Sequence, residues 1–216
     1  MVLLMTKSQY YHDLFNIITL LFVQSFVFSY LFLYYHDHDI RNSSSKMAWI
    51  KFICSIFFTY SLIDLIWIWI YPSSVPKYSN SIILHHIFSL ISIVYTYLEP
   101  QLGFWAMLML SVELNTLLII LKRNLPSYYT TLNQMVTVSF YITWIIQRLL
   151  MFPILTFVFY YEWRRLSNER GTLYNYSLAG PIFSALFSIL NFKWSYDKII
   201  RIQAKQRQRL AEKREQ

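Results

Sequence analysis

The stretch Ser79–Glu99, SNSIILHHIFSLISIVYTYLE, decides the fold of this chain. It is an apolar run of about 20 residues, the length that an α-helix needs to cross a membrane. Two adjacent histidines, His85 and His86, lie inside it. A polar ring in hydrocarbon needs a partner or water, so the pair predicts a transmembrane helix with a polar neighbour inside a bundle.

The composition indicates the same environment for the whole chain. Hydrophobic residues make up 56%, aromatic residues 19% and charged residues 14%, which is too apolar for an ordinary soluble domain. Glycine and proline, at 3 and 6 residues, are too scarce for a loop-rich protein. The single cysteine, Cys54, excludes an intramolecular disulfide. We therefore predict one all-α domain, a polytopic membrane bundle.

Six transmembrane helices are predicted from the apolar runs and their proline and charge boundaries. They cover roughly Leu14–Tyr35, Met47–Tyr71, Ser79–Glu99, Leu102–Leu121, Tyr128–Tyr161 and Ser177–Ile200. The fifth run is too long for one straight span, so we expect tilt, interfacial ends or a kink at Pro153. The predicted organisation is a cytosolic segment at 1–12, a six-helix domain at 13–200 and a basic tail at 201–216.

The distribution of basic residues predicts the orientation. The loops on the side of the termini, together with the tail, hold more lysine and arginine than the other loops, which favours two cytosolic termini. The sequons at Asn42 and Asn175 then fall outside the cytosol, although both are too close to a span to predict glycosylation. The tail RIQAKQRQRLAEKREQ follows directly on a span, so attraction to an anionic leaflet explains its charge better than nucleic-acid binding.

Polar side chains of four predicted spans lie at a similar depth. Asp64, His85, Glu113 and Asn191 each lie roughly 9–12 Å from the cytosolic boundary, counted along their helices. This layer predicts an enclosed polar pocket or a cavity for a lipid headgroup. The structural alternative is that these residues only form hydrogen bonds between helices, each contributing about 1 kcal/mol or less.

Arg148 lies nearer mid-membrane and needs a partner. We expect Glu113 first and Asp64 second. Adjacent residues on a helix point about 100° apart, so one of His85 and His86 can face a cavity while a neighbouring helix holds the other. A general base or an acyl acceptor needs this arrangement.

A metal site is not predicted. The other histidines, His12, His36 and His38, fall in terminal or loop segments on opposite sides of the membrane under this topology. The aromatic residues near span ends are typical of interfacial anchors.

Several of these residues together resemble the TLC (TRAM, LAG1 and CLN8 homology) family, and within it the small TLC domain-containing proteins. The resemblance covers roughly residues 40–200. It rests on Asp64, Leu84-His85-His86, Ser111-x-Glu113-x-Asn115-Thr116, Lys122-Arg123-Asn124-Leu125, Arg148 with Pro153, and Leu190-Asn191-Phe192-x-Trp194. It implies a six-helix membrane domain in lipid metabolism, sensing or trafficking, commonly in the endoplasmic reticulum.

Two functions follow from the resemblance. The first is lipid homeostasis by binding a membrane lipid, with lipid-binding candidates Asp64, His85, His86, Glu113, Asn115, Arg148 and Asn191. The second is that of a ceramide synthase, an acyltransferase that moves a fatty acyl group from acyl-CoA to a sphingoid base through His85 or His86. The ceramide-synthase signature adds a His-Asp pair and a further Asp in the next span, where this chain has only Glu113. A cargo-related or translocon-associated role, as in other relatives, and a homo-oligomer are also left open.

Overall fold

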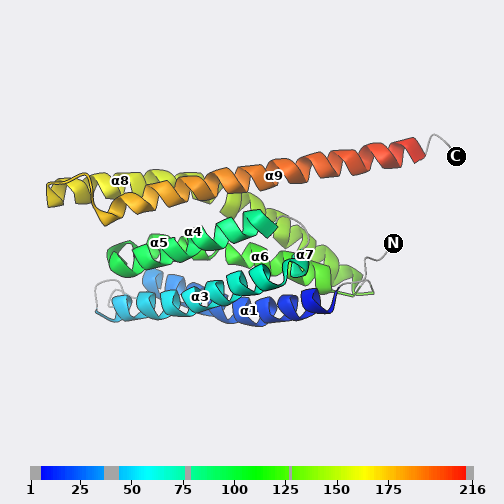
Figure 1. Cartoon of the computed structure of the whole chain (residues 1–216), viewed down its shortest axis with the longest axis horizontal. Helices are drawn as coiled ribbons and strands as arrows, with labels where there is room; N and C mark the ends of the chain where they lie inside the picture. Colours follow the sequence, from blue (N-terminus) through cyan, green and yellow to red (C-terminus); the bar gives the residue numbers. More distant parts are fainter. Residues whose placement is uncertain (1–5, 37–43, 76–78, 127, 213–216) are drawn as a thin grey trace.

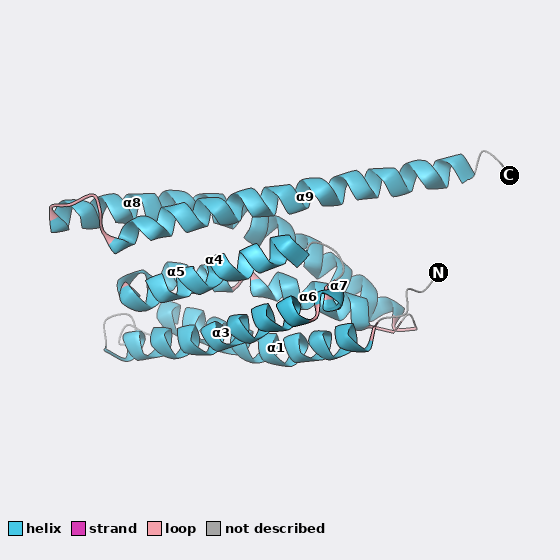
Figure 2. Cartoon of the chain, viewed as in Figure 1, coloured by secondary structure: helices cyan, strands magenta, loops and turns pink. Residues whose placement is uncertain are grey.

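The computed structural model describes residues 6–36, 44–75, 79–126 and 128–212. Their regular structure is entirely helical, and the long helices lie side by side in a bundle (Figures 1 and 2). The helices are α1 (Lys7–His36), α3 (Ser44–Ile70), α4 (Ser79–Leu98), α5 (Gly103–Leu110), α6 (Glu113–Asn124), α7 (Thr130–Thr143), the π-helix η3 (Trp144–Met151), α8 (Phe152–Arg170) and α9 (Ala179–Glu212). Short 3₁₀ turns are η1 (Pro72–Ser74), η2 (Pro100–Leu102) and η4 (Tyr176–Leu178). The predicted all-α fold class is confirmed.

Five helical segments of the described residues are long and apolar enough to cross a membrane. They are Lys7–His36, Lys46–Ile70, Asn80–Leu98, Pro100–Asn124 and Thr130–Arg170. The sixth predicted span lies in α9, which packs along α8 and α4. The start of α1 and the end of α9 lie at the same end of the bundle (Figure 1). The chain is therefore a polytopic integral membrane protein.

The fourth predicted span is two helices rather than one. Helix α5 ends at Leu110 and α6 begins at Glu113, and between them the amides of Val112, Leu114 and Asn115 bond to carbonyls three residues back. The side chain of Gln24 in α1 donates to the Leu110 carbonyl at 2.9 Å. Long-range hydrogen bonding thus supports a break that hydropathy alone does not predict.

The fifth predicted span bends at a π-helix. Thr130–Arg170 is one segment, and it changes direction between α7 and α8 (Figure 1). Proline has no amide proton, and its ring clashes with the carbonyl four residues back, which for Pro153 is that of Leu149. The wider π turn of η3 ends just before Pro153. The expected kink is present, and the π-helix that forms it carries Arg148.

The apolar core lies where α1, α3, α5 and α6 meet. Leu20, Ile53 and Met107 are fully or almost fully buried there. Gly103 opens α5 against α3, and a Cβ at this position would come within 2.2 Å of the Ile50 side chain. A larger residue at this position would have to displace the buried Ile50 side chain, so glycine allows the close approach of the two helices.

Helix α9 runs without a break through the predicted boundary at residue 200, and its end extends beyond the other helices (Figure 1). Asn175 lies in the α8–α9 connection, where its side-chain amide donates to the Ser167 hydroxyl and the Thr172 carbonyl, each at 2.9 Å. Its carbonyl oxygen accepts the amide of Ser177, so this sequon forms part of a local turn. The sequon at Asn42 and the histidine His38 lie outside the described residues.

Candidate functional site

A cavity of about 450 Å³ opens among the polar side chains of the bundle. Its walls come from α1, α3, α4, α6, η3 and α9, so it depends on nearly the whole fold. The lining includes His12, Asp64, His85, His86, Glu113 and Arg148. Its volume lies in the range of pockets that hold small molecules.

Asp64 is the centre of one wall. Its carboxylate, 3% exposed, accepts hydrogen bonds from His12 Nε2 at 2.7 Å and from Asn16 Nδ2 at 3.1 Å. His86 Nε2 lies 2.7 Å from the other carboxylate oxygen. The Tyr60 hydroxyl donates to the side-chain oxygen of Asn16 at 2.6 Å. These contacts join α1, α3 and α4 and satisfy a carboxylate that would otherwise be costly in an apolar bundle.

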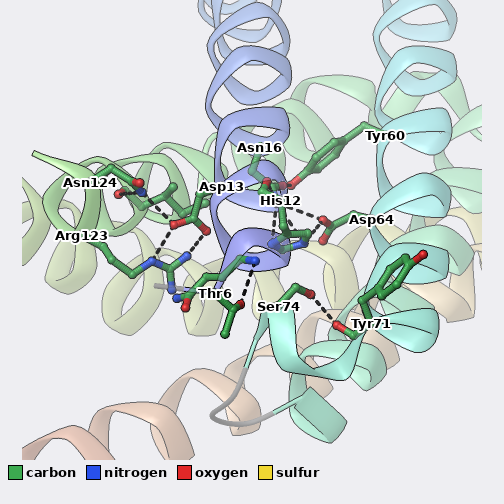
Figure 3. Close-up of polar contacts among 12 residues, drawn as sticks. Thr6, His12, Asp13, Asn16, Tyr60, Asp64, Tyr71, Ser74, Arg123 and Asn124 are labelled. Carbon is green, nitrogen blue, oxygen red and sulfur yellow. Dashed lines mark hydrogen bonds and ion pairs between the residues drawn. The ribbon is translucent and has the colours of Figure 1, made fainter. Parts of the chain in front are cut away.

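The prediction for His12 was wrong. It is not in a terminal segment but in the first turns of α1, where it is 4% exposed and points at Asp64 (Figure 3). The helix begins at Lys7, before the apolar run, so the hydropathy of the sequence does not predict that His12 is helical. A usable signal is the spacing of His12 and Asn16, because residues four apart lie on one helix face.

The neighbouring residue anchors α1 on its other side. The buried carboxylate of Asp13 accepts hydrogen bonds from Arg123 Nε and Asn124 Nδ2, each at 2.8 Å, and pairs with a second guanidinium nitrogen of Arg123. Figure 3 shows His12 and Asp13 reaching toward α3 and α6 respectively. Two consecutive residues thus hold the N-terminal part of α1 against the cavity.

His85 forms a second acid–histidine pair. Its Nε2 lies 3.4 Å from Glu113 Oε1, and its Nδ1 has no hydrogen-bond partner among the described residues. The His85 ring packs against Phe187 and Trp194, at centroid distances of 5.3 and 5.6 Å. In the tautomer whose Nε2–H donates a hydrogen bond to Glu113, Nδ1 carries the free lone pair.

The α5–α6 break positions Glu113. This residue is the first of α6, where backbone amides and the helix dipole favour a negative charge. Gln147 in η3 donates to the carbonyl of Ser111 at 3.0 Å, and Gln24 in α1 donates to the carbonyl of the preceding residue, Leu110. Glutamines of two other helices, α1 and η3, therefore hold the break.

The prediction that Arg148 pairs with Glu113 or Asp64 was wrong. Its guanidinium donates to Asn115 Oδ1 at 3.0 Å, Asn191 Oδ1 at 3.0 Å and Thr116 Oγ1 at 3.1 Å. Among the described residues, Glu113 pairs with His85 instead, and Asp64 pairs with His12 and His86. Arg148 is 6% exposed, and its forked donors join η3 to α6 and α9.

Aromatic rings cover the same wall. The Arg148 guanidinium lies 5.1 Å from the Trp144 ring and 5.3 Å from the Trp194 ring. Trp144 Nε1 donates to the Ser195 hydroxyl at 2.8 Å, which fixes the ring against α9. The Lys198 ammonium lies 4.6 Å from the centroid of the Trp144 ring and also lines the cavity.

A second cavity of about 40 Å³ also reaches His85 and Glu113. Ser89 and Ile93 of α4 line it, four and eight residues after His85 and therefore on the same helix face. Phe152 and Phe187 complete its mostly apolar wall. The His85–Glu113 pair thus lies where the cavity lined by ionisable side chains meets a smaller, more apolar one.

The described residues contain no group of three histidine, cysteine, aspartate or glutamate side chains arranged to hold a metal ion. The close pairs are instead acid–histidine contacts with hydrogen-bond geometry.

The model of the TLC domain (TRAM, LAG1 and CLN8) matches residues 14–201 of this sequence. The chain belongs to the TLC domain family. The match includes every residue that lines the cavity except His12, which lies two residues before its start. Searches of curated proteins and of solved structures each found no match.

The TLC domain of this chain brings all the sequence-predicted lipid-binding residues to one site. Asp64, His85, His86, Glu113, Asn115 and Arg148 line the cavity, and Asn191 accepts a hydrogen bond from Arg148 without lining the cavity itself. Sequence reasoning missed His12, Asn16, Tyr60 and Lys198.

Proposed function

We propose that this TLC-domain protein acts in lipid homeostasis by binding or sensing the headgroup of a membrane lipid in the 450 Å³ cavity. The observation that carries the proposal is the set of buried ionisable groups around it, with Asp64, Glu113 and Arg148 each 3–6% exposed. Ionisable side chains inside a membrane bundle are costly and typically mark a functional site. The family match supports a lipid-related role.

The proposed orientation places both termini and the cavity's polar wall on the cytosolic side, most simply in the endoplasmic reticulum. The tail at 201–216 then lies beside an anionic leaflet, where each basic residue adds about 1 kcal/mol of attraction. A protease applied to intact microsomes is expected to remove a C-terminal tag. A protected tag contradicts this orientation.

Lipid binding is tested by purifying the full chain in mild detergent and identifying the lipids that remain bound by mass spectrometry. A defined lipid should remain with the native chain and be depleted in His86→Gln. His36→Ala is the matched control, because His36 is an exposed histidine outside the cavity lining. Equal lipid content in all three proteins contradicts the proposal.

An acyltransferase of ceramide-synthase type is the second candidate, and the unpartnered Nδ1 of His85 favours it. In that reaction, Nδ1 attacks the thioester carbonyl of acyl-CoA, the C–S bond breaks, and CoA leaves as a thiolate. The amine of a sphingoid base then attacks the acyl carbon, the amide bond forms as the bond to Nδ1 breaks, and the amine proton neutralises the CoA thiolate, which regenerates His85. Glu113 holds the Nε2 proton and stabilises the positive charge on the ring.

The two candidates are separated by mass spectrometry of the His85–His86 peptide after incubation with acyl-CoA. An acyl adduct that disappears in His85→Ala but persists in His36→Ala establishes the transferase. Bound lipid with no adduct and no turnover supports binding alone.

A further inference from the structure

Two cations of the cavity wall, Arg148 and Lys198, are held by groups without negative charge. The Arg148 guanidinium donates to amide and hydroxyl oxygens and lies over the rings of Trp144 and Trp194. The Lys198 ammonium lies 3.6 Å from the centroid of the Phe140 ring and 4.6 Å from that of Trp144. The same indole ring thus contacts both cations.

The carboxylates of the cavity form their ion pairs with other residues, although the charge of Glu113 also attracts Arg148. Asp64 lies between two histidines, and Glu113 faces His85. Arg123, which also lines the cavity, is paired with Asp13. Among the ion pairs of the described residues, none joins a carboxylate to Arg148 or Lys198.

This arrangement leaves a positive potential on the wall formed by η3 and α9. Aromatic faces and neutral oxygens orient a cation, but they do not cancel its net charge. The potential is strong because apolar surroundings screen it less than water does. This wall, with Arg148 buried and Lys198 partly buried, therefore favours an anionic ligand group.

We propose that a phosphate group of the ligand binds at this wall, between Arg148 and Lys198. Phosphate offers three acceptor oxygens and up to two negative charges, so one group can meet two cations from different helices. Arg201, one turn after Lys198 on α9, also lines the cavity and adds positive charge. This inference rests on the proposed lipid binding and narrows it to phosphate-bearing ligands.

The test uses the full chain in detergent micelles and measures the shift of its thermal unfolding midpoint with added ligand. The probes are dioctanoyl phosphatidic acid, dioctanoylglycerol with the same acyl chains, and inorganic phosphate. Phosphatidic acid should stabilise the native chain at concentrations where dioctanoylglycerol does not. A similar shift with inorganic phosphate supports the same site and identifies a soluble phosphate as the source.

Lys198→Met keeps the length of the side chain and removes its charge. Its apparent affinity for phosphatidic acid should fall about 10-fold, the effect of one hydrogen bond to a charged group. Lys198→Arg should retain binding. Arg207→Gln is the matched control, because Arg207 lies on the same helix, exposed and outside the cavity lining. Arg201→Gln is a second variant at an exposed position and should weaken binding in the same direction.

Equal binding of phosphatidic acid and dioctanoylglycerol overturns the phosphate inference and leaves lipid binding intact. Equal losses in Lys198→Met and Arg207→Gln also overturn it, because they indicate attraction to the general basic surface. Failure of the native chain to respond to both phosphatidic acid and inorganic phosphate overturns this inference, whereas the proposed lipid binding is overturned by the absence of any lipid bound to the purified chain.

Discussion

Replacing Asp64 by asparagine removes the charge at the point where α1, α3 and α4 meet. Asp64 accepts from His12, His86 and Asn16 at 2.7–3.1 Å and is 3% exposed. Each hydrogen bond to a charged group contributes roughly 1.5–3 kcal/mol, and removing one partner of a buried pair costs roughly 3–5 kcal/mol. Asparagine keeps one acceptor oxygen, so we expect Asp64→Asn to lower the free energy of unfolding by about 3 kcal/mol.

The loss is measured by unfolding the detergent-solubilised chain with increasing SDS in mixed micelles, followed by tryptophan fluorescence. It corresponds to a fall of roughly 6–12 °C in the thermal midpoint for a chain of this size. A double-mutant cycle with His12→Phe isolates the contact between α1 and α3. We expect the two changes to be less than additive, with a coupling energy of about 1.5 kcal/mol.

The control is Asp197→Asn, which removes an acid from a surface ion pair with Lys193 at 3.2 Å. It should cost less than about 0.5 kcal/mol. A loss for Asp64→Asn no larger than that of the control refutes the reasoning. Strict additivity with His12→Phe refutes the placement of His12 at Asp64.

Three further changes are measured by the same SDS titration. Arg148→Lys should lower the free energy of unfolding by about 2 kcal/mol, because an ammonium cannot reproduce the guanidinium hydrogen bonds to two helices. A loss near zero contradicts this role of Arg148. Gln147→Leu removes the hydrogen-bond donor to the Ser111 carbonyl and should lower the free energy of unfolding by about 1 kcal/mol. An unchanged unfolding midpoint would show that the α5–α6 break does not need this hydrogen bond. Glu99→Gln breaks the ion pair with the partly exposed Arg170. It should lower the free energy of unfolding by about 1 kcal/mol at low salt and by less at high salt, because salt screens the ion pair. A loss that does not change with salt contradicts an electrostatic origin.

The helices and the polar layer are predictable from the sequence because both depend on local information. Apolar length determines which segments can cross a membrane, and proline ends them, as at Pro72 and Pro100. Counting residues from each boundary then gives the depth of Asp64, His85 and Glu113, which do meet at one cavity.

Which side chains touch is decided by the tertiary structure alone. The partner of Arg148 depends on how η3, α6 and α9 are rotated about their axes. The depth of a residue, counted along the sequence, gives no information about that rotation. The same holds for His12, which reaches Asp64 because α1 starts early and packs beside α3. The break before Glu113 is supported by glutamines of two distant helices. The sequence by itself determined an all-α membrane bundle with a layer of ionisable groups. Only the folded chain decided how those groups pair, because their partners come from distant segments and depend on the packing of the helices.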